Sequence, residues 1–278
     1  MDADRLTKAL IDLIAKAVID LPDDVEESIR KARQHESNKR ALVMLDSILE
    51  NIKVARADNA PLCQDTGVLV FYVKHGDNIN RSLLEESIIE AVRRATDEIP
   101  LRANIVDPLS RVNTDDNTGY GIPRIYYEYD GGLDDVEVTV LPKGAGSENT
   151  TSIGMLNPGE GVDGLIKYVV DSVKCAGGKP CPPTIVGVGV GGTAETALYL
   201  AKKSLLRDVG SHHPVKQYRE LESRLYGKIN ELGVGVMGVG GDTTCLGVHV
   251  EYADCHTASL PVAVNLQCWA ARKATTRI

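Results

Sequence analysis

Aromatic residues are scarce in this chain of 278 residues, which contains one Trp and one Phe. A surface that stacks nucleic-acid bases needs several aromatic rings, so such a platform is not expected. A basic excess is also lacking, because the formal net charge is -8. Nonspecific binding to a phosphate backbone relies on clustered Lys and Arg. We therefore expect no nucleic-acid partner.

Long apolar runs are also missing: none reaches the roughly 18–20 residues that a membrane-spanning helix requires. The first twenty residues carry four acidic side chains in an amphipathic pattern, which is atypical of a signal peptide. Six cysteines are too few for a disulfide scaffold in a chain of this length. We expect a cytoplasmic protein without a membrane partner, in which placed cysteines serve metal binding or catalysis.

The sequence is otherwise that of an ordinary globular protein, with 43% hydrophobic and 25% charged residues. Helical periodicity over residues 6–18 and 37–55, and Pro22 followed by two aspartates, predict a helical N-terminal region of about residues 1–57. The other predicted elements are strands at 68–73, 124–129, 136–141, 184–190, 244–252 and 260–266, and helices at 85–98, 161–175, 194–207 and 215–232.

This order predicts a mixed α/β (α+β) fold, because helices and strands alternate in the second half of the chain. We expect one catalytic domain over residues 1–278. Its helical N-terminal region packs on a mixed α/β portion of about residues 58–278, and the mixed portion carries the functional site.

Glycine-rich runs occur at 187–192 and 233–238, and both match G-x-G-x-x-G. A dinucleotide fingerprint needs the glycines after a strand and before a helix. The first run falls within the predicted strand, and no helix is predicted after the second. Close backbone approach, or anion contact by backbone N–H groups, is the better interpretation. A third run, residues 144–151, either holds a carboxylate or is a flexible loop.

Three cysteines stand beside residues that bend the backbone or at the end of an apolar run. They are Cys63 in Pro-Leu-Cys-Gln-Asp-Thr-Gly, Cys181 in Lys-Pro-Cys-Pro-Pro, and Cys268 in Asn-Leu-Gln-Cys-Trp. A structural zinc site normally fills all four coordination positions. Three thiolates on one centre leave a position for substrate, which is how a metal site becomes a Lewis acid.

These motifs together resemble the class I fumarases and the related L-tartrate dehydratases, from about residue 40 to the C-terminus. The resemblance implies a [4Fe-4S] cluster held by Cys63, Cys181 and Cys268, with the iron that lacks a thiolate acting as Lewis acid on the substrate hydroxyl and carboxylate. Single-chain members continue into a second domain. We therefore expect an α subunit that needs a β subunit, and a small dicarboxylate substrate.

The resemblance also implies roles for other positions. Asp65 and His256 are expected to handle protons. Gln64, Arg102 and Gly146 are expected to bind the substrate carboxylates, since a planar guanidinium suits a carboxylate. Arg111 stays open as the alternative to Arg102, and His249 is a weaker candidate than His256.

The other three cysteines, Cys175, Cys245 and Cys255, are expected to be inert thiols, because the family pattern does not need them. Fumarate and L-malate are the favoured substrates, and L-tartrate is the alternative. An electron-transfer or sensing protein with a three-cysteine cluster is the alternative outside the hydratases. A nucleotide-binding module would depend on the glycine matches alone.

Overall fold

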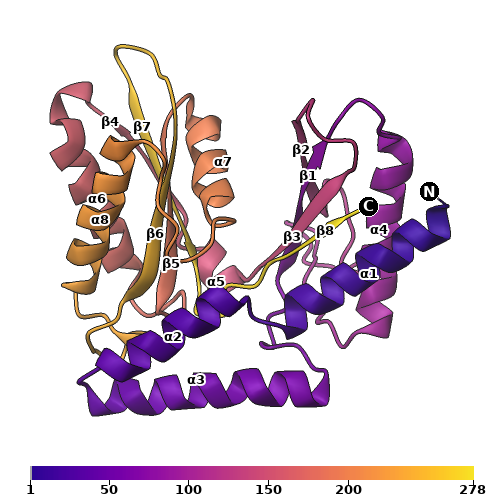
Figure 1. The fold of residues 1–278 in the computed structure, drawn as a ribbon, viewed down its shortest axis with the longest axis horizontal. Coiled ribbons are helices and arrows are strands. Elements are labelled where there is room, and N and C mark those ends of the chain that lie inside the picture. The colour runs from indigo at the N-terminus through magenta and orange to yellow at the C-terminus, as the bar shows by residue number, and fades with distance from the viewer. Residues whose placement is uncertain (1) are drawn as a thin grey trace. The chain divides into compact units, whose positions relative to one another are not determined.

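The computed structural model describes residues 2–278 and shows a mixed fold with two four-stranded sheets (Figure 1). The described residues form two compact units. The first unit comprises the chain up to Pro22, Asn51–Ala145 and Arg272–Ile278; the second comprises Asp23–Glu50 and Gly146–Ala271. Within the described chain, no helix is both long and apolar enough to cross a bilayer. The predicted mixed α+β class is confirmed.

The first unit contains one mixed sheet and two packed helices. The sheet order is β2-β1-β3-β8, with β1 parallel to β2 and antiparallel to β3. The helices pack on this sheet through a shared core that includes Ile14, Phe71 and Ile88. The elements are α1 (Ala3–Ile19), β1 (Val68–His75), α4 (Arg81–Glu98), β2 (Arg124–Tyr129), β3 (Glu137–Lys143) and β8 (Ala274–Arg277).

The second unit contains the other sheet, in the order β4-β7-β5-β6. Helices α6 and α8 pack on one face of this sheet, and α7 covers the opposite face (Figure 1). The elements are α5 (Ala145–Glu148), β4 (Ser152–Leu156), η1 (Pro158–Glu160), α6 (Gly161–Ala176), β5 (Thr184–Gly191), α7 (Ala194–Ser204), α8 (Lys216–Asn230), η2 (Val236–Gly238), β6 (Cys245–Ala253) and β7 (Leu260–Gln267).

The three predicted N-terminal helices are present as α1, α2 (Asp23–His35) and α3 (Lys39–Asp58). In α1, Leu6, Leu10, Ile14 and Val18 lie on one buried stripe, as their helical spacing predicts. Helix α1 belongs to the first unit, whereas α2 and the start of α3 belong to the second. The assignment of residues 1–278 to one catalytic domain stays a prediction.

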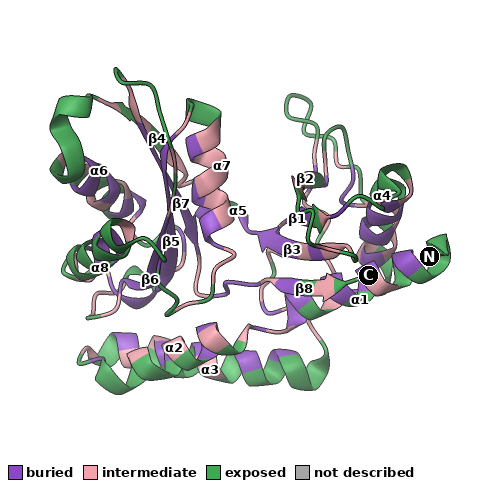
Figure 2. Ribbon diagram, turned by 45° about the horizontal axis from the view of Figure 1, so that its top comes forward, coloured by how far each residue is buried: buried purple, intermediate pink, exposed green. Residues whose placement is uncertain are grey.

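Strand β5 is buried along its whole length (Figure 2). This close packing explains why the strand contains glycines. Val186 and Val188 face the core shared with α6 and α8. Gly187 and Gly189 face α7: a Cβ on Gly189 would lie 2.0 Å from the carbonyl oxygen of Ala197. The first glycine run therefore permits a helix to approach a strand closely, as interpreted from the sequence.

Some elements differ from the sequence predictions, for local reasons. Helix α4 starts four residues earlier than predicted because the Asn80 side chain caps it, accepting a hydrogen bond from the amide of Leu83. Strand β4 was missed because Gly154 weakens its pattern; a Cβ there would meet the ring of Tyr168 at 2.6 Å.

Candidate active site

Cys63 lies in a turn of the first unit that is anchored through the residue before it. The amide of Leu62 donates to the carbonyl of Val18 over 3.0 Å. The carbonyl of Leu62 accepts a 2.9 Å hydrogen bond from Asn51 Nδ2. Leu62 itself is 3% exposed, whereas Cys63 is half-buried and Gln64 is exposed. The anchored backbone therefore holds Cys63 and Gln64 at the surface of this unit.

Asp65 is oriented by backbone donors on both carboxylate oxygens. Gly67 N donates to Oδ1 over 3.0 Å, and Ala145 N donates to Oδ2 over 2.7 Å. Gly144 makes the second contact possible, because a Cβ there would lie 3.1 Å from Asp65 Oδ2. The Asp65 carboxylate is thus held in one orientation two residues after Cys63.

Arg102 is tied to the same turn through its backbone. Arg102 N donates to Thr66 Oγ1 over 3.2 Å, and Asn117 Nδ2 donates to the Arg102 carbonyl over 3.1 Å. Its side chain is exposed. Arg111 lies in the following loop, where its amide bonds to the carbonyl of Asp107. The Arg102 backbone is therefore held beside Thr66, the residue that follows Asp65.

Cys181 and Cys268 are brought together within the second unit. Trp269 N donates to the carbonyl of Cys181 over 3.1 Å, so the residue after one cysteine bonds to the other cysteine. Both cysteines are half-buried. Cys181 has φ 52°, a left-handed backbone conformation that a side chain rarely adopts. Strain of this kind is concentrated at functional sites in proteins.

The loop that carries Gly146 is fixed by charged side chains that the sequence analysis did not assign. Glu148 Oε1 lies 2.5 Å from Lys202 Nζ, and Asn265 Nδ2 donates to Glu148 Oε2 over 3.3 Å. Gly146 packs against the carbonyl of Lys179, which a Cβ would approach to 3.0 Å. The run at 144–151 is therefore an anchored turn containing α5, which contradicts the flexible-loop alternative. The sequence signal that could have identified this anchor is Glu148, a charged residue two positions after Gly146.

His256 is not brought close to Cys268. It lies exposed in the loop between β6 and β7, where its Nδ1 accepts a 3.1 Å hydrogen bond from Ala258 N. The whole of β7, eight residues, separates this loop from Cys268. An extended strand of that length spans about 25 Å. Figure 1 shows the loop and the end of β7 at opposite ends of the sheet.

The remaining cysteines are all thiols rather than members of disulfides, and they differ in burial. Cys175 and Cys255 are exposed, whereas Cys245 is buried. Burial raises the pKa of the Cys245 thiol, which disfavours the thiolate that binds metal. This environment suits the inert role expected for Cys245.

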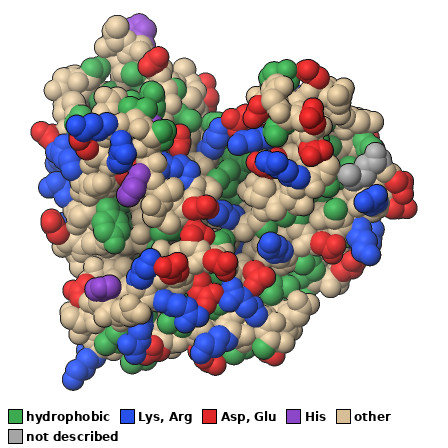
Figure 3. Space-filling model, in the orientation of Figure 1, with side chains coloured by type: hydrophobic (Ala, Val, Ile, Leu, Met, Phe, Trp, Pro, Cys, Tyr) green, Lys and Arg blue, Asp and Glu red, His purple; other side chains and the backbone are tan. Residues whose placement is uncertain are grey.

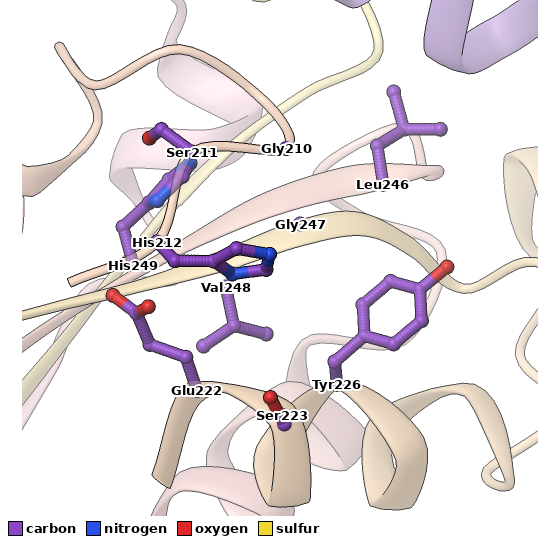
Figure 4. Close-up of a pocket in the computed structure, with 10 residues that line it drawn as sticks. All are labelled: Gly210, Ser211, His212, Glu222, Ser223, Tyr226, Leu246, Gly247, Val248 and His249. Carbon is purple, nitrogen blue, oxygen red and sulfur yellow. The ribbon is translucent and has the colours of Figure 1, made fainter. Parts of the chain in front are cut away.

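A separate pocket of about 250 Å³ lies between α8, β6 and the loop before α8 (Figure 4). His212 projects across Val248 into this pocket, and His249 contributes a second imidazole (Figure 4). The Glu222 carboxylate is engaged in hydrogen bonds within the fold. It accepts one from Arg207 Nη1 over 2.6 Å and two from backbone amides. Of the candidate residues from the sequence, only His249, the weaker alternative to His256, lines the pocket.

Charged groups of both signs are interspersed over the face drawn in Figure 3. Ion pairs on exposed helices of the protein include Arg33 with Asp46 and Lys167 with Asp171. Exposed pairs of this kind contribute little to stability.

The donor chemistry fits an iron–sulfur cluster. Fe–S clusters take cysteine thiolates, and three half-buried cysteines lie in turns with anchored backbones. Arg272 adds a buried guanidinium whose Nη2 donates to the carbonyl of Asp65 over 2.9 Å. Cys63 belongs to the first unit, and Cys181 and Cys268 to the second. Across residues 2–278, no three His, Cys, Asp or Glu side chains form a preassembled cation site.

Comparison with known proteins defines the class of this site. A sequence profile described as fumarate hydratase (Fumerase) matches residues 7–277. The chain belongs to the class I fumarate hydratase family and is a hydro-lyase.

Two relatives match almost the whole chain. A protein of Methanocaldococcus jannaschii, provisionally named L(+)-tartrate dehydratase subunit alpha, is 47% identical over 278 residues, covering 99% of this chain and 98% of its own. The L(+)-tartrate dehydratase subunit alpha of Escherichia coli K12 is 35% identical over 272 residues, covering 98% and 90%. The chain therefore corresponds to the α subunit of this family.

Proposed function

We propose that this chain is the α subunit of a two-subunit hydro-lyase that reversibly hydrates fumarate to L-malate. The observation that carries the proposal is the carboxylate of Asp65, oriented by the amides of Gly67 and Ala145 beside Cys63 and the tethered Arg102. This turn combines a thiol ligand, a proton-transfer group and a guanidinium in one unit. The family match to fumarate hydratase supports the same reaction.

Cys63, Cys181 and Cys268 are proposed to hold a [4Fe-4S] cluster. When bound through three thiolates, the cluster supplies Lewis acidity at its remaining iron, and this helps hydroxide to leave. The strained backbone of Cys181 and the hydrogen bond from Trp269 to its carbonyl support the ligand assignment. A cytoplasmic location is part of this proposal, because reducing compartments preserve thiols.

Asp65 is proposed as the acid–base residue. Both of its oxygens accept backbone hydrogen bonds, so the carboxylate keeps one orientation while Oδ1 or Oδ2 holds a proton. A side chain without these donors would sample several rotamers and lose alignment with the substrate. The paired donors therefore support proton transfer at a defined position.

Gln64, Arg102 and Gly146 are proposed to bind the substrate carboxylates. The exposed guanidinium of Arg102 can bind a carboxylate through two parallel hydrogen bonds. Gln64 is exposed directly after Cys63. Gly146 lies in the turn that Glu148 anchors to Lys202. Together these positions offer a charged donor, an amide and an exposed backbone to a dicarboxylate.

The proposed acid–base role of His256 requires an assembly of more than one chain. Since β7 separates it from Cys268, it would act on a cluster held by another chain of an assembly. A partner β subunit is part of the same proposal, because both relatives are named as alpha subunits. It is expected to supply further groups to the dicarboxylate.

L-tartrate dehydration is the second candidate, because both relatives described above carry that name. The deciding experiment uses the anaerobically reconstituted α–β complex. Its kcat/KM is measured with fumarate, L-malate and L-tartrate. We expect the highest value with fumarate or L-malate, and a tenfold preference for L-tartrate would replace the first proposal with the second.

The carboxylate role of Arg102 has a matched control in Arg111. Arg102→Lys should raise KM about tenfold or more, because the two-pronged guanidinium contact is lost. Arg111→Lys should leave KM unchanged, since the Arg111 amide bonds to Asp107 rather than to Thr66 beside Asp65. The reverse result would move the role to Arg111.

A further inference from the structure

Arg272 is a buried arginine whose hydrogen bonding is incomplete. Its side chain is among the large, fully buried side chains of the described chain, and the residue is 1% exposed. Nη2 donates to the carbonyl oxygen of Asp65 over 2.9 Å. Nε and Nη1 are also buried and make no hydrogen bond to any part of the chain that the structure describes.

The Asp65 carboxylate lies near Arg272 without hydrogen-bonding to it: a Cβ on Gly144 would lie 3.1 Å from Asp65 Oδ2 and 3.9 Å from Arg272 Nη2. Ala271 and Ala274 beside Arg272 are buried and apolar. The Asp65 carboxylate is already engaged by two backbone amides, and Arg272 bonds to the Asp65 backbone instead. A guanidinium keeps its charge when buried, and buried donors without a partner are costly. A resident anion at this position would remove that cost.

Arg272 lies near Cys268 in the sequence and is linked to the Cys63 turn by a hydrogen bond. It follows Cys268 by four residues, and its hydrogen-bond partner Asp65 follows Cys63 by two. A cluster with three thiolate ligands is an anionic group rich in sulfur acceptors. Hydrogen bonds to those sulfurs and nearby positive charge set the reduction potential of such clusters.

We propose that Arg272 is a positioning residue for the cluster: Nη2 fixes the Asp65 carbonyl, and Nε and Nη1 donate to cluster sulfur. This inference rests on the proposed function insofar as a cluster is bound. A diffusing substrate is a poorer partner for these two nitrogens, because the side chain is shielded from solvent. Arg272 thus contacts both the Asp65 turn and the cluster, and its positive charge raises the reduction potential of the cluster.

The test uses the reconstituted complex with Arg272→Gln and Arg272→Lys, and with Arg277→Gln as control. Arg277 ends strand β8, which begins two residues after Arg272; it is exposed and paired with Glu137, so its loss removes a positive charge from the surface only. Iron and sulfide per chain, the midpoint reduction potential and the thermal unfolding temperature are measured for each. If Arg272→Gln does not fold, Arg272→Lys decides the question.

We expect Arg272→Gln to retain a cluster with a more negative potential and to convert several-fold faster to [3Fe-4S] in air. Arg272→Lys should fall between that variant and wild type, and Arg277→Gln should match wild type. An unchanged potential with a lower unfolding temperature would show a purely structural arginine. An unchanged potential with loss of the spectral response to L-malate would assign the guanidinium to substrate. Either result overturns the inference.

The failure of the proposed function has a different signature. A wild-type complex that holds no iron and sulfide would overturn both proposals at once. A wild-type complex with a cluster but no hydration of fumarate would overturn the substrate assignment. The potential measurement on the Arg272 variants would still decide the role of this residue.

Discussion

The amide of Trp269 donates a 3.1 Å hydrogen bond to the carbonyl oxygen of Cys181. This bond joins the end of strand β7 to the turn that precedes β5. It places the backbones of two cysteines side by side although they are far apart in the sequence. Hydrogen bonds and packing contacts of this kind predict how substitutions change cluster binding, proton transfer, glycine packing and acid stability.

Cysteine substitution tests the ligand set. Cys63→Ser, Cys181→Ser and Cys268→Ser should each lose most of the bound iron and sulfide, because a serine hydroxyl is a poor ligand for a soft iron site. Cys175→Ser and Cys255→Ser are the controls, since both side chains are exposed. Chemical analysis of iron and sulfide per chain makes the comparison. Loss of the cluster in a control variant would contradict the assignment.

Substitution of Asp65 tests the proposed acid–base role. Asp65→Asn should lower kcat by about 10²–10⁴-fold, the usual contribution of a positioned acid–base group. The amide should keep part of the contact with Ala145 N, so cluster content should stay close to wild type. Steady-state kinetics normalised to iron content measure the effect. Asp97→Asn, at an exposed position on α4, is the control, and equal kcat for both variants would reject the role.

The glycines of β5 can be tested through stability. Gly189→Ala should destabilise the fold by about 1–3 kcal/mol or more, because the new methyl group meets the Ala197 carbonyl at 2.0 Å. Gly227→Ala in α8 is the matched control. Apart from its own helix backbone, no atom of the described residues lies within 4 Å of its Cβ position, so it should stabilise the helix by about 0.5–1 kcal/mol. Urea unfolding of both variants measures the sign and size.

Acid stability should depend on Asp242. Ser37 donates to Asp242 Oδ2 from its hydroxyl over 2.6 Å and from its amide over 2.8 Å, and these bonds hold the pKa of that carboxyl below its ordinary value. A depressed folded-state pKa contributes stability above the unfolded value and loses it as pH falls through the folded value. The stability difference between wild type and Asp242→Asn should therefore shrink below about pH 4. Urea unfolding from pH 7 to pH 3 measures it, and a constant difference would refute the link.

Much of the secondary structure could be predicted from local pattern. The spacing of Leu6, Leu10, Ile14 and Val18 predicts α1, and the buried valines of β5 predict that strand. Strand β8 escaped prediction because four residues are too few to show a strand pattern. It is stabilised by pairing with β3, where Thr139 and Thr275 share a 2.8 Å hydrogen bond.

The candidate site was predictable where one motif carries its chemistry and not where distant residues meet. Cys63, Gln64 and Asp65 are adjacent in the sequence, so their turn can be read directly. Lys202 and Arg272 have no such signal, because each acts through a residue far away in the chain, Glu148 and Asp65 respectively.

The sequence by itself determined the mixed fold class, the main helices and strands, and the family, because periodicity and short motifs depend on neighbouring residues. Tertiary structure decided which strands pair, how the Asp65 carboxylate is oriented, and that β7 separates His256 from Cys268. These relationships depend on hydrogen bonds and packing between distant segments, whose energies exist only once the chain has folded.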